Sequence, residues 1–281
     1  MRNLFRYALR VFSVAPIALA VLAGFMTPAR AANADFTVVT LNLWHDKADW
    51  PKRQALIVKT LRELHPDVIA LQEVLQHEGL PNQARTLASA LGYHAYFSTV
   101  DAPGAPKRYG NAVLTRHRVI DEEWKALLPL DDYRTVAHLR IAIGKRTLDV
   151  YATHLNFADD GAAVRREQAA DLLAYERAHA PADGTLVLGD FNAPADAPEL
   201  AALAGEFRDA YDTRHPDAAQ NAPEHSTLNL VYYAPLRIDH VMFDPRRFEV
   251  LDARRLFDRA DANGTWASDH YGIWTRLRWR K

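Results

Sequence analysis

The 281-residue sequence contains no cysteine, and this absence removes several kinds of chemistry from consideration. A chain without thiols forms no disulfides, no cysteine-based zinc sites and no iron–sulfur clusters, and it has no thiol nucleophile. Glycine and proline are scarce, at 12 and 15 residues, and no segment of 20–50 residues recurs, which excludes collagenous, low-complexity and repeat architectures. The remaining composition, 49% hydrophobic and 25% charged, is that of a globular protein.

The short motifs of several large enzyme classes are also missing. The sequence has no H-E-x-x-H of zinc peptidases, no G-x-S-x-G of serine hydrolases, no Walker A loop and no dinucleotide-binding G-x-G-x-x-G.

The one long apolar segment lies near the N-terminus, and we interpret it as part of a secretory signal peptide. An arginine-rich start precedes the apolar run 11–26, and the sequence A-R-A at 29–31 has the small-x-small pattern of a cleavage site. The apolar run is shorter than the roughly 20 residues of a membrane-spanning helix, so we expect cleavage of residues 1–31 rather than a retained anchor. The mature chain, residues 32–281, is then expected in the periplasm or secreted, with no transmembrane anchor.

Charge gives a further indication about partners. Removing residues 1–31 would remove four arginines and no acidic residue, so the net charge would fall from −1 to −5. Proteins that bind nucleic acid without sequence preference usually carry a basic excess, although a bound metal ion adds positive charge that a residue count misses. The roughly 250 remaining residues approach the upper size of a single hydrophobic core, so we expect one domain, and we expect it to be a monomer.

Apolar runs rich in β-branched residues alternate with segments of helical period, which predicts an α/β protein with both parallel and antiparallel strands. In the helix expected at 164–177, Leu172 and Leu173 should face inward and Arg165 should face solvent, with Arg166 and Glu167. The other expected helices are 53–64 and 83–91, the polar stretch 214–224 is expected to be a surface loop, and the expected strands are 36–41, 67–71, 93–99, 111–115, 136–143, 147–153, 185–188, 237–243 and 271–278.

Polar and ionisable residues stand at the ends of six of these apolar strands. In an α/β sheet the rim at the strand ends is where ligand-binding groups converge. Each residue alone has an ordinary structural explanation, such as a turn former or a buried histidine, but six such strand ends in one chain indicate a shared site. The residues are Asn42, Glu73, His154 with Asn156, Asp190 with Asn192, Asp239, and Asp269 with His270.

The blocks that contain these residues resemble the endonuclease/exonuclease/phosphatase superfamily. They are T-L-N at 40–42, L-Q-E at 71–73, T-H-L-N at 153–156, G-D-F-N at 189–192, I-D-H-V at 238–241 and S-D-H at 268–270. All six occur in the family's order and span nearly the whole mature chain. The resemblance implies a four-layer α/β/β/α sandwich, in which two mixed sheets pack face to face with helices outside. It also implies a metal-dependent phosphoric ester hydrolase of the phosphodiesterase or nuclease type.

The resemblance further implies a metal centre held by Glu73, with Asn42 and Asp269 beside it. Oxygen ligands without thiols favour a hard ion, so Mg²⁺ or Mn²⁺ is expected before Zn²⁺. By the same resemblance, Asp190 would orient or deprotonate the attacking water, and Asn192 would hold that water or a phosphate oxygen.

Two histidines complete the expected catalytic group. His270 would contact the scissile phosphate and be oriented by Asp239, a pairing that favours the imidazolium. His154 would bind a phosphate oxygen or act as general acid. Its expected orienting partner is Asn111, where pancreatic-type nucleases have a glutamate, and an amide would raise the pKa of His154 less than a carboxylate does. We count Asn111 among the substrate-binding residues.

Arg134 stands where many members of the family have a phosphate-contacting arginine, so it is the second expected substrate-binding residue. His240 follows Asp239 directly and, by strand alternation, should point away from the site.

Two function classes remain open at this point. The first is an exported phosphodiesterase that hydrolyses a nucleic acid, a phospholipid headgroup or a small phosphodiester by in-line attack of an activated water. The second is a non-catalytic binding module that retains the fold. A family member that has lost catalysis should lack at least one of the four residues expected to be essential. All four are present: Glu73, Asp190, Asp269 and His270. A lipid would fit exposed apolar loop tips, whereas DNA would fit lysines and arginines around the site.

Overall fold

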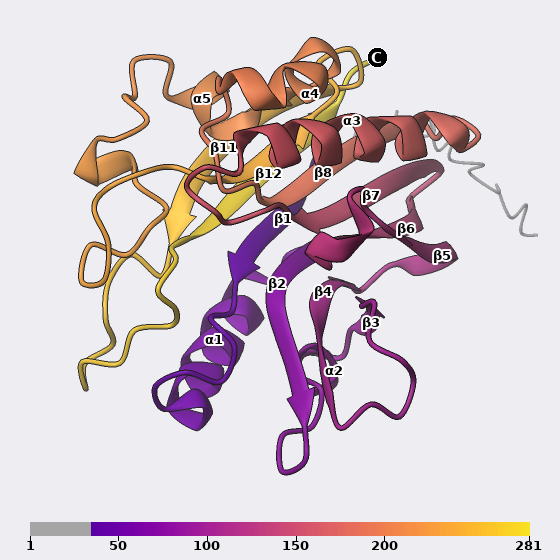
Figure 1. Ribbon diagram of the computed structural model, residues 1–281. Coiled ribbons are helices and arrows are strands. Elements are labelled where there is room, and N and C mark those ends of the chain that lie inside the picture. The colour runs from indigo at the N-terminus through magenta and orange to yellow at the C-terminus, as the bar shows by residue number, and fades with distance from the viewer. Residues whose placement is uncertain (1–34) are drawn as a thin grey trace, which may run out of the picture. The chain divides into compact units, whose positions relative to one another are not determined.

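Two six-stranded mixed sheets pack face to face with helices outside them, which confirms the predicted sandwich (Figure 1). The structure, a computed structural model, describes residues 35–281, so the expected signal peptide at 1–31 lies outside the described residues. Among residues 35–281 there is no helix with the length and apolar character needed to cross a membrane.

The first sheet, sheet A, contains both ends of the described chain. Strand β1 pairs in parallel with β2, and the other neighbours in the sheet are antiparallel. In spatial order its strands are β11 (Phe248–Leu256), β12 (Gly272–Trp279), β1 (Asp35–Asn42), β2 (Val68–His77), β4 (Lys107–Thr115) and β3 (His94–Ser98).

The second sheet, sheet B, is built from the middle of the chain. Its one parallel pair in the described region is β7 with β8. In spatial order its strands are β5 (Arg118–Ala126), β6 (Thr135–Ile143), β7 (Arg146–His154), β8 (Gly184–Asp190), β10 (Asp239–Phe243) and β9 (Arg208–Asp209).

Helices cover the outer face of each sheet, as Figure 1 shows with α1 and α2 on one side of the strands and α3 and α4 on the other. Helix α1 begins where the Asp49 side chain accepts a hydrogen bond from the backbone N–H of Lys52, and α2 ends at Gly92 in the left-handed conformation. The helices are α1 (Trp50–Leu64), α2 (Gln83–Leu91), α3 (Ala162–Ala178), α4 (Ala201–Glu206) and α5 (Ala210–Arg214), with short 3₁₀ turns at Leu130–Asp132, Pro198–Leu200 and Pro223–His225.

Three hydrophobic cores separate the four layers, because the central strands are apolar on both faces. Val38 points into the core between the sheets, whereas its neighbour Val39 points toward α1 and α2. Leu188 and Val187 repeat this division in sheet B, where the third core lies under α3 and α4. Consecutive residues of one strand therefore stabilise two different layers.

Most of the predicted elements are present, and the surface loop expected at 214–224 follows α5 as predicted. The prediction that Arg165 faces solvent is wrong. Arg165 is buried, and its guanidinium forms an ion pair at 3.0 Å with Glu199, a residue of the later segment that covers α3. The period of α3 alone gives no sign of this later segment.

Candidate active site

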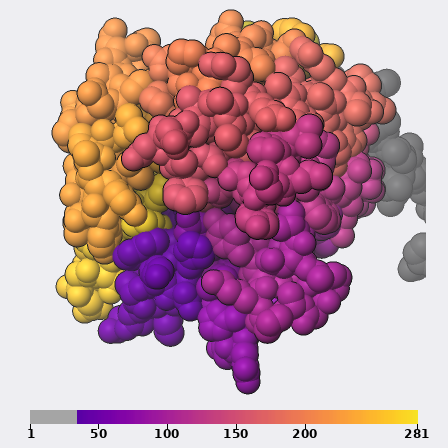
Figure 2. All heavy atoms as spheres, viewed as in Figure 1, coloured from indigo at the N-terminus to yellow at the C-terminus, as the bar shows by residue number. Residues whose placement is uncertain are grey.

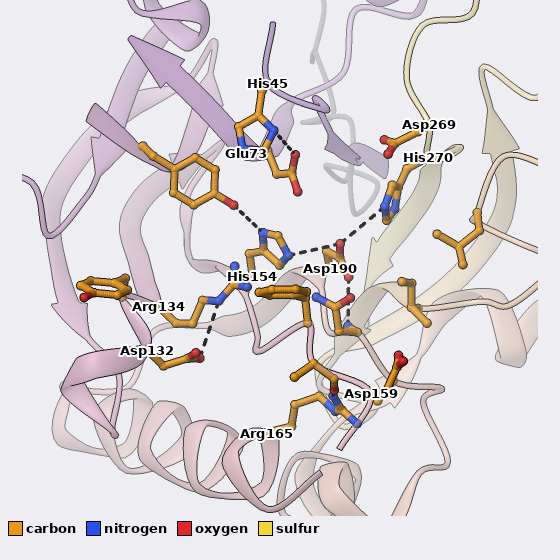
Figure 3. A pocket seen from close by; sticks show the side chains of 18 of the residues that line it. His45, Glu73, Asp132, Arg134, His154, Asp159, Arg165, Asp190, Asp269 and His270 are labelled. Atoms are coloured by element: carbon orange, nitrogen blue, oxygen red, sulfur yellow. Dashed lines mark hydrogen bonds and ion pairs between the residues drawn. The ribbon is translucent and has the colours of Figure 1, made fainter. Parts of the chain in front are cut away.

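One pocket of about 1100 Å³ collects most of the residues expected at the site, and Figure 3 shows them projecting toward one another. Asn42, Asn111 and Asp239 are buried behind its wall and are not among the lining residues. The expected residues that line it are Glu73, Arg134, His154, Asp190, Asn192, Asp269 and His270.

The sheet register explains how residues distant in sequence meet. In sheet B, His154 ends β7 and stands in register with Asp190 at the end of β8, which in turn stands in register with Asp239 at the start of β10. Asn42 and Glu73 come from β1 and β2 of sheet A. The Asn42 amide crosses to the other sheet and donates a hydrogen bond to Asp190 Oδ2 at 3.0 Å. The site therefore exists only where the two sheets are packed together.

Four residues that line the pocket, Tyr133 with a φ of 59° and the three named next, adopt backbone conformations that are unusual for side chains with a Cβ. His45, Glu73 and Asn192 have φ angles of 49°, 55° and 50°. Glu73 lies where the register of β2 against β4 shifts between Leu71 and Val74, so a bulge places its carboxylate at the pocket. Such strained positions concentrate at functional sites, where the surrounding structure maintains them.

Asp190 lies at the centre of the hydrogen-bond network. Its Oδ1 accepts from the backbone N–H of Asn192 at 2.9 Å, and its Oδ2 lies 3.5 Å from His154 Nε2 and 3.8 Å from His270 Nε2. Burial, together with the charge of Asp239, raises the pKa of Asp190 to about 7. A carboxylate with such a pKa is suited to accept a proton near neutral pH.

His270 is held as a cation. Its Nδ1 donates to Asp239 Oδ2 at 2.8 Å. Burial alone would lower the pKa of His270, but the charges of Asp239 and Asp190 outweigh burial and raise this pKa to about 10. The Nε2–H of an imidazolium in this orientation faces the pocket beside Asp190, where it would donate to an anion.

His154 is held in the neutral form. Burial lowers its pKa well below the usual value, and the charges of Arg134, His270 and His45 act in the same direction. Its Nε2 lies 3.5 Å from Asp190 Oδ2, which only accepts when ionised, so in that state Nδ1 is left to accept from the Tyr109 hydroxyl at 3.3 Å. The proton of His154 is then on Nε2, on the side of Asp190. This arrangement fits a hydrogen-bond donor to a phosphate oxygen better than an imidazolium acid.

Asn111 is not the partner of His154, contrary to expectation. Its amide donates to the carbonyl oxygen of Thr135 at 2.9 Å and to the Thr135 hydroxyl at 3.2 Å, and it does not line the pocket. Tyr109, two residues earlier on the same face of β4, takes the place expected for Asn111.

The carboxylates of Glu73 and Asp269 form the oxygen-rich part of the pocket. Burial opposes ionisation of Glu73, but the hydrogen bond from His45 Nδ1 at 2.8 Å, together with the charges of His45 and His270, outweighs it and lowers the pKa of Glu73. Burial and the nearby charge of Glu73 raise the pKa of Asp269, whose Oδ2 accepts from the Tyr233 hydroxyl at 3.0 Å. Crowded carboxylates of this kind fit a hard divalent cation, which would relieve their repulsion. Asn42 lies beside Glu73 and helps to lower its pKa.

Arg134 and Asn192 occupy the wall of the pocket. The Arg134 side chain lies against the ring of Phe157, 5.7 Å from its centroid, and 3.7 Å from the Asp132 carboxylate. The Asn192 amide donates to the carbonyl oxygen of Leu155 at 3.0 Å. His240 points away from the site as predicted, with Nδ1 at Asp209 and Nε2 at the carbonyl oxygen of Ala193.

Sequence reasoning missed the residues that support the expected ones. His45, Tyr109 and Tyr233 all line the pocket and contact Glu73, His154 and Asp269, respectively. His45 lies only three residues after Asn42, so its proximity in sequence was an available signal. Tyr233 lies in a segment with no motif.

Exposed apolar side chains stand around the pocket on two segments that are far apart in sequence. Phe157 and Tyr133 are 72% and 69% exposed, and Tyr233 is 47% exposed. The pocket also has more carboxylates than cations, because eight Asp or Glu side chains line it against three Lys or Arg. Figure 2 shows the indigo-to-magenta N-terminal half meeting the salmon and orange segments across the face viewed.

Residues 39–270 match the Endonuclease/Exonuclease/phosphatase family, and the chain belongs to this family. It is therefore an enzyme of the class of metal-dependent phosphoric ester hydrolases, of the nuclease and phosphodiesterase type. Comparison with curated proteins finds no match.

Solved structures share the fold at low sequence identity. An endonuclease/exonuclease/phosphatase from Beutenbergia cavernae is 22% identical, with a TM-score of 0.67 over 87% of this chain and 72% of that chain. The human Nocturnin catalytic domain with bound sulfate is 19% identical, with a TM-score of 0.71 over 89% and 95% of the two chains. D. rerio TDP2 complexed with a single-strand DNA product is 15% identical, with a TM-score of 0.71 over 87% and 99%.

Proposed function

We propose that the protein is an exported phosphodiesterase that uses Mg²⁺ or Mn²⁺ and hydrolyses its substrate by in-line attack of water. The observation that carries this proposal is the position of Asp190, a buried carboxylate with a pKa near 7 between the ring nitrogens of His154 and His270. A binding module that had lost catalysis would have no reason to keep a buried carboxylate in this costly environment.

Asp190 accepts the proton of the attacking water, because its raised pKa matches that task near neutral pH. Asn42 and the backbone of Asn192 hold its two oxygens in place. The carboxylate therefore keeps one orientation while the water is deprotonated.

The two histidines bind the phosphoryl oxygens in different ways. His270 contributes a positive charge, which the buried Asp239 carboxylate maintains. Neutral His154 contributes an Nε2–H donor, whose direction is fixed by the Tyr109 hydroxyl. Fixed donors aimed at developing negative charge are a major source of rate enhancement in such reactions.

Glu73 and Asp269, with Asn42 nearby, are the residues that would hold the divalent ion. When bound, the ion supplies Lewis-acid polarisation of the phosphate and neutralises charge on the leaving oxygen. Arg134, on the opposite wall, would contact a further phosphate oxygen.

The surroundings of the pocket favour a compact phosphodiester attached to an apolar or aromatic group, such as a lipid headgroup ester, over an extended nucleic acid. Eight acidic side chains repel a long polyanion, whereas Tyr133, Phe157 and Tyr233 offer apolar surface at the entrance. Assays of DNA, RNA, sphingomyelin, inositol phosphates and a chromogenic bis-aryl phosphate with Mg²⁺ distinguish these substrates.

Removal of the metal tests the chemistry. Activity on the best substrate of this panel should vanish in excess EDTA and return when Mg²⁺ or Mn²⁺ is added, because Glu73 and Asp269 cannot polarise phosphate by themselves. The E73Q variant should need more Mg²⁺ for half-maximal rate. Hydrolysis at the full rate in excess EDTA would show that the metal assignment is wrong.

Export is tested on protein recovered from its native host. Mass spectrometry should find a mature N-terminus near Ala32 in the periplasmic or secreted fraction, as the positive, apolar and cleavage regions of the sequence predict. Intact Met1 in a cytosolic fraction would refute the signal peptide.

A further inference from the structure

A second group of metal-binding side chains lies in sheet B outside the pocket. Glu123 on β5, His138 on β6 and His179 directly after α3 each offer one ligand atom, and these atoms lie within 4.8 Å of one another. None of the three lines the pocket. We propose that Glu123, His138 and His179 bind a Zn²⁺ ion that links the edge strand β5 to the C-terminal end of α3.

The protonation of His138 leaves a lone pair directed at this cluster. Its ring is fully buried, and its Nε2 lies 3.1 Å from Asp149 Oδ1. Two hydrogen bonds of 2.7 Å from Arg140 keep the Asp149 carboxylate ionised, so it only accepts and Nε2 must carry the proton. In the neutral ring, Nδ1 then has a bare lone pair. This nitrogen has no hydrogen-bond partner and lies 3.7 Å from Glu123 Oε1.

His179 is oriented in the same way. Its Nδ1 lies 2.8 Å from the carbonyl oxygen of Tyr175, which can only accept, so the proton is on Nδ1. Its Nε2 lies 2.6 Å from Glu123 Oε1. In the neutral ring this places a second lone pair against the carboxylate, and only a proton or a metal ion between them resolves the repulsion.

The two histidines therefore show the pattern of metal ligands. A histidine that binds a metal through one nitrogen usually donates the other N–H to a carboxylate or a backbone carbonyl, as His138 does to Asp149 and His179 does to Tyr175. The rings of His138 and His179 also pack against each other, with centroids 4.4 Å apart.

The ligand set favours zinc. Two imidazoles and one carboxylate suit Zn²⁺ better than Mg²⁺ or Ca²⁺, which prefer oxygen ligands alone. Any two ligand atoms of a tetrahedral zinc site are about 3.4 Å apart, and the distances of 3.7 Å and 2.6 Å from Glu123 lie on either side of this value. The Glu123 side chain is 45% exposed, so water can reach the fourth position.

Glu122, the neighbour of Glu123, provides a matched control. Its carboxylate also lies 2.6 Å from a histidine nitrogen, Nε2 of His94, but within residues 35–281 no third metal-binding side chain joins this pair. The experiment compares the full chain with its E122Q, E123Q and H179Q variants. Each protein is stripped with chelator and titrated with ZnCl₂ by calorimetry, and its melting temperature is measured with and without zinc.

We expect the wild type and E122Q each to bind one more zinc ion per chain than E123Q and H179Q do. At zinc concentrations 100-fold above Kd, the melting temperature of the wild type should rise by about 5 °C more than that of E123Q. Equal stoichiometry and equal shifts in all four proteins would overturn the proposal and identify the cluster as a protonated histidine pair. Since Glu123 lies outside the pocket, E123Q should keep its Mg²⁺-dependent phosphodiesterase activity, so this test is independent of the proposed function.

Discussion

At the scale of single residues, the active site is defined by how neighbours set the charge of each group. Asp190 and His270 are 1% and 7% exposed, so they are buried groups and not surface-facing ones. Burial disfavours both the ionised carboxylate of Asp190 and the protonated imidazole of His270. Of the two, only His270 is hydrogen-bonded to a residue of opposite charge, Asp239. The same environment thus produces a carboxylate that readily takes a proton beside an imidazolium that keeps its proton.

Substitutions at these two positions should separate catalysis from stability. D190N should reduce kcat by about 10²–10⁴-fold, because the base is lost, while its melting temperature stays equal or rises, because a buried charge is removed. H270A should reduce kcat to a similar extent and also lower stability by about 3 kcal/mol or more, because Asp239 is left buried without its partner. The measurements are kcat and melting temperature for both variants. Near-wild-type turnover in D190N, with a large loss of stability, would contradict the catalytic assignment.

At the scale of secondary-structure elements, the central strands were predictable, whereas of the four edge strands only β3 was predicted, at 93–99. β7 and β8 are apolar runs buried on both faces, which gives a strong sequence signal. β5 and β11, each at one edge of its sheet, were not predicted. Their exposed faces carry charges, such as Asp121 and Glu122 in β5, which interrupt the apolar period and protect the edge from pairing with other chains.

The site was predictable to the extent that its residues lie in motifs at strand ends. Gly189 of the G-D-F-N block shows why one of these motifs is strict. Its φ is 153°, and a Cβ there would lie 2.0 Å from the carbonyl oxygen of Thr153 on β7, so only glycine lets β8 approach closely enough to align Asp190 with His154. Tyr109 and Glu199 could not be found in this way, because their roles depend on tertiary packing against His154 and Arg165.

Asp67, just before β2, joins several elements of sheet A and should make stability depend on pH. Its Oδ2 accepts from the backbone N–H of Thr37 at 2.7 Å, and its Oδ1 from Arg116 and His117 at 2.6 Å. Burial opposes ionisation, but these partners outweigh it and lower the pKa of Asp67. A depressed pKa stabilises the fold fully above the unfolded-state value of about 3.9, and this stabilisation is lost as the pH falls through the lower folded-state value.

D67N should therefore reduce the free energy of unfolding by about 1–3 kcal/mol at pH 7, and its difference from the wild type should shrink below about pH 4. Urea unfolding at pH 7, 5, 4 and 3 measures this difference. D35N is the control, because Asp35 forms a more exposed ion pair with Arg278, and loss of such a pair should change stability little. A difference between D67N and the wild type that stays constant down to pH 3 would exclude the assigned role of Asp67.

At the scale of the whole molecule, the two sheets contribute complementary parts of the site. Sheet A supplies Asn42 and Glu73, the proposed oxygen ligands, and sheet B supplies His154, Asp190 and Asp239. The entrance combines distant segments in the same way, since Tyr133 and Phe157 come from one part of the chain and Tyr233 from another. We therefore expect substrate choice to depend on the loops around the catalytic centre.

The exposed aromatic side chains at the entrance should affect substrate binding more than the chemical step. Y133A and F157A should each raise KM for the best phosphodiester by about 3- to 10-fold, which is the scale of one lost aromatic contact, and Y133A should leave kcat unchanged. W124A is the control, because Trp124 is also exposed, at 42%, but lies on β5 outside the pocket. Steady-state kinetics of the three variants provides the measurement. Unchanged KM in both Y133A and F157A would rule out an apolar group of the substrate at this entrance, and a fall in kcat for Y133A would instead place Tyr133 at the reacting phosphate.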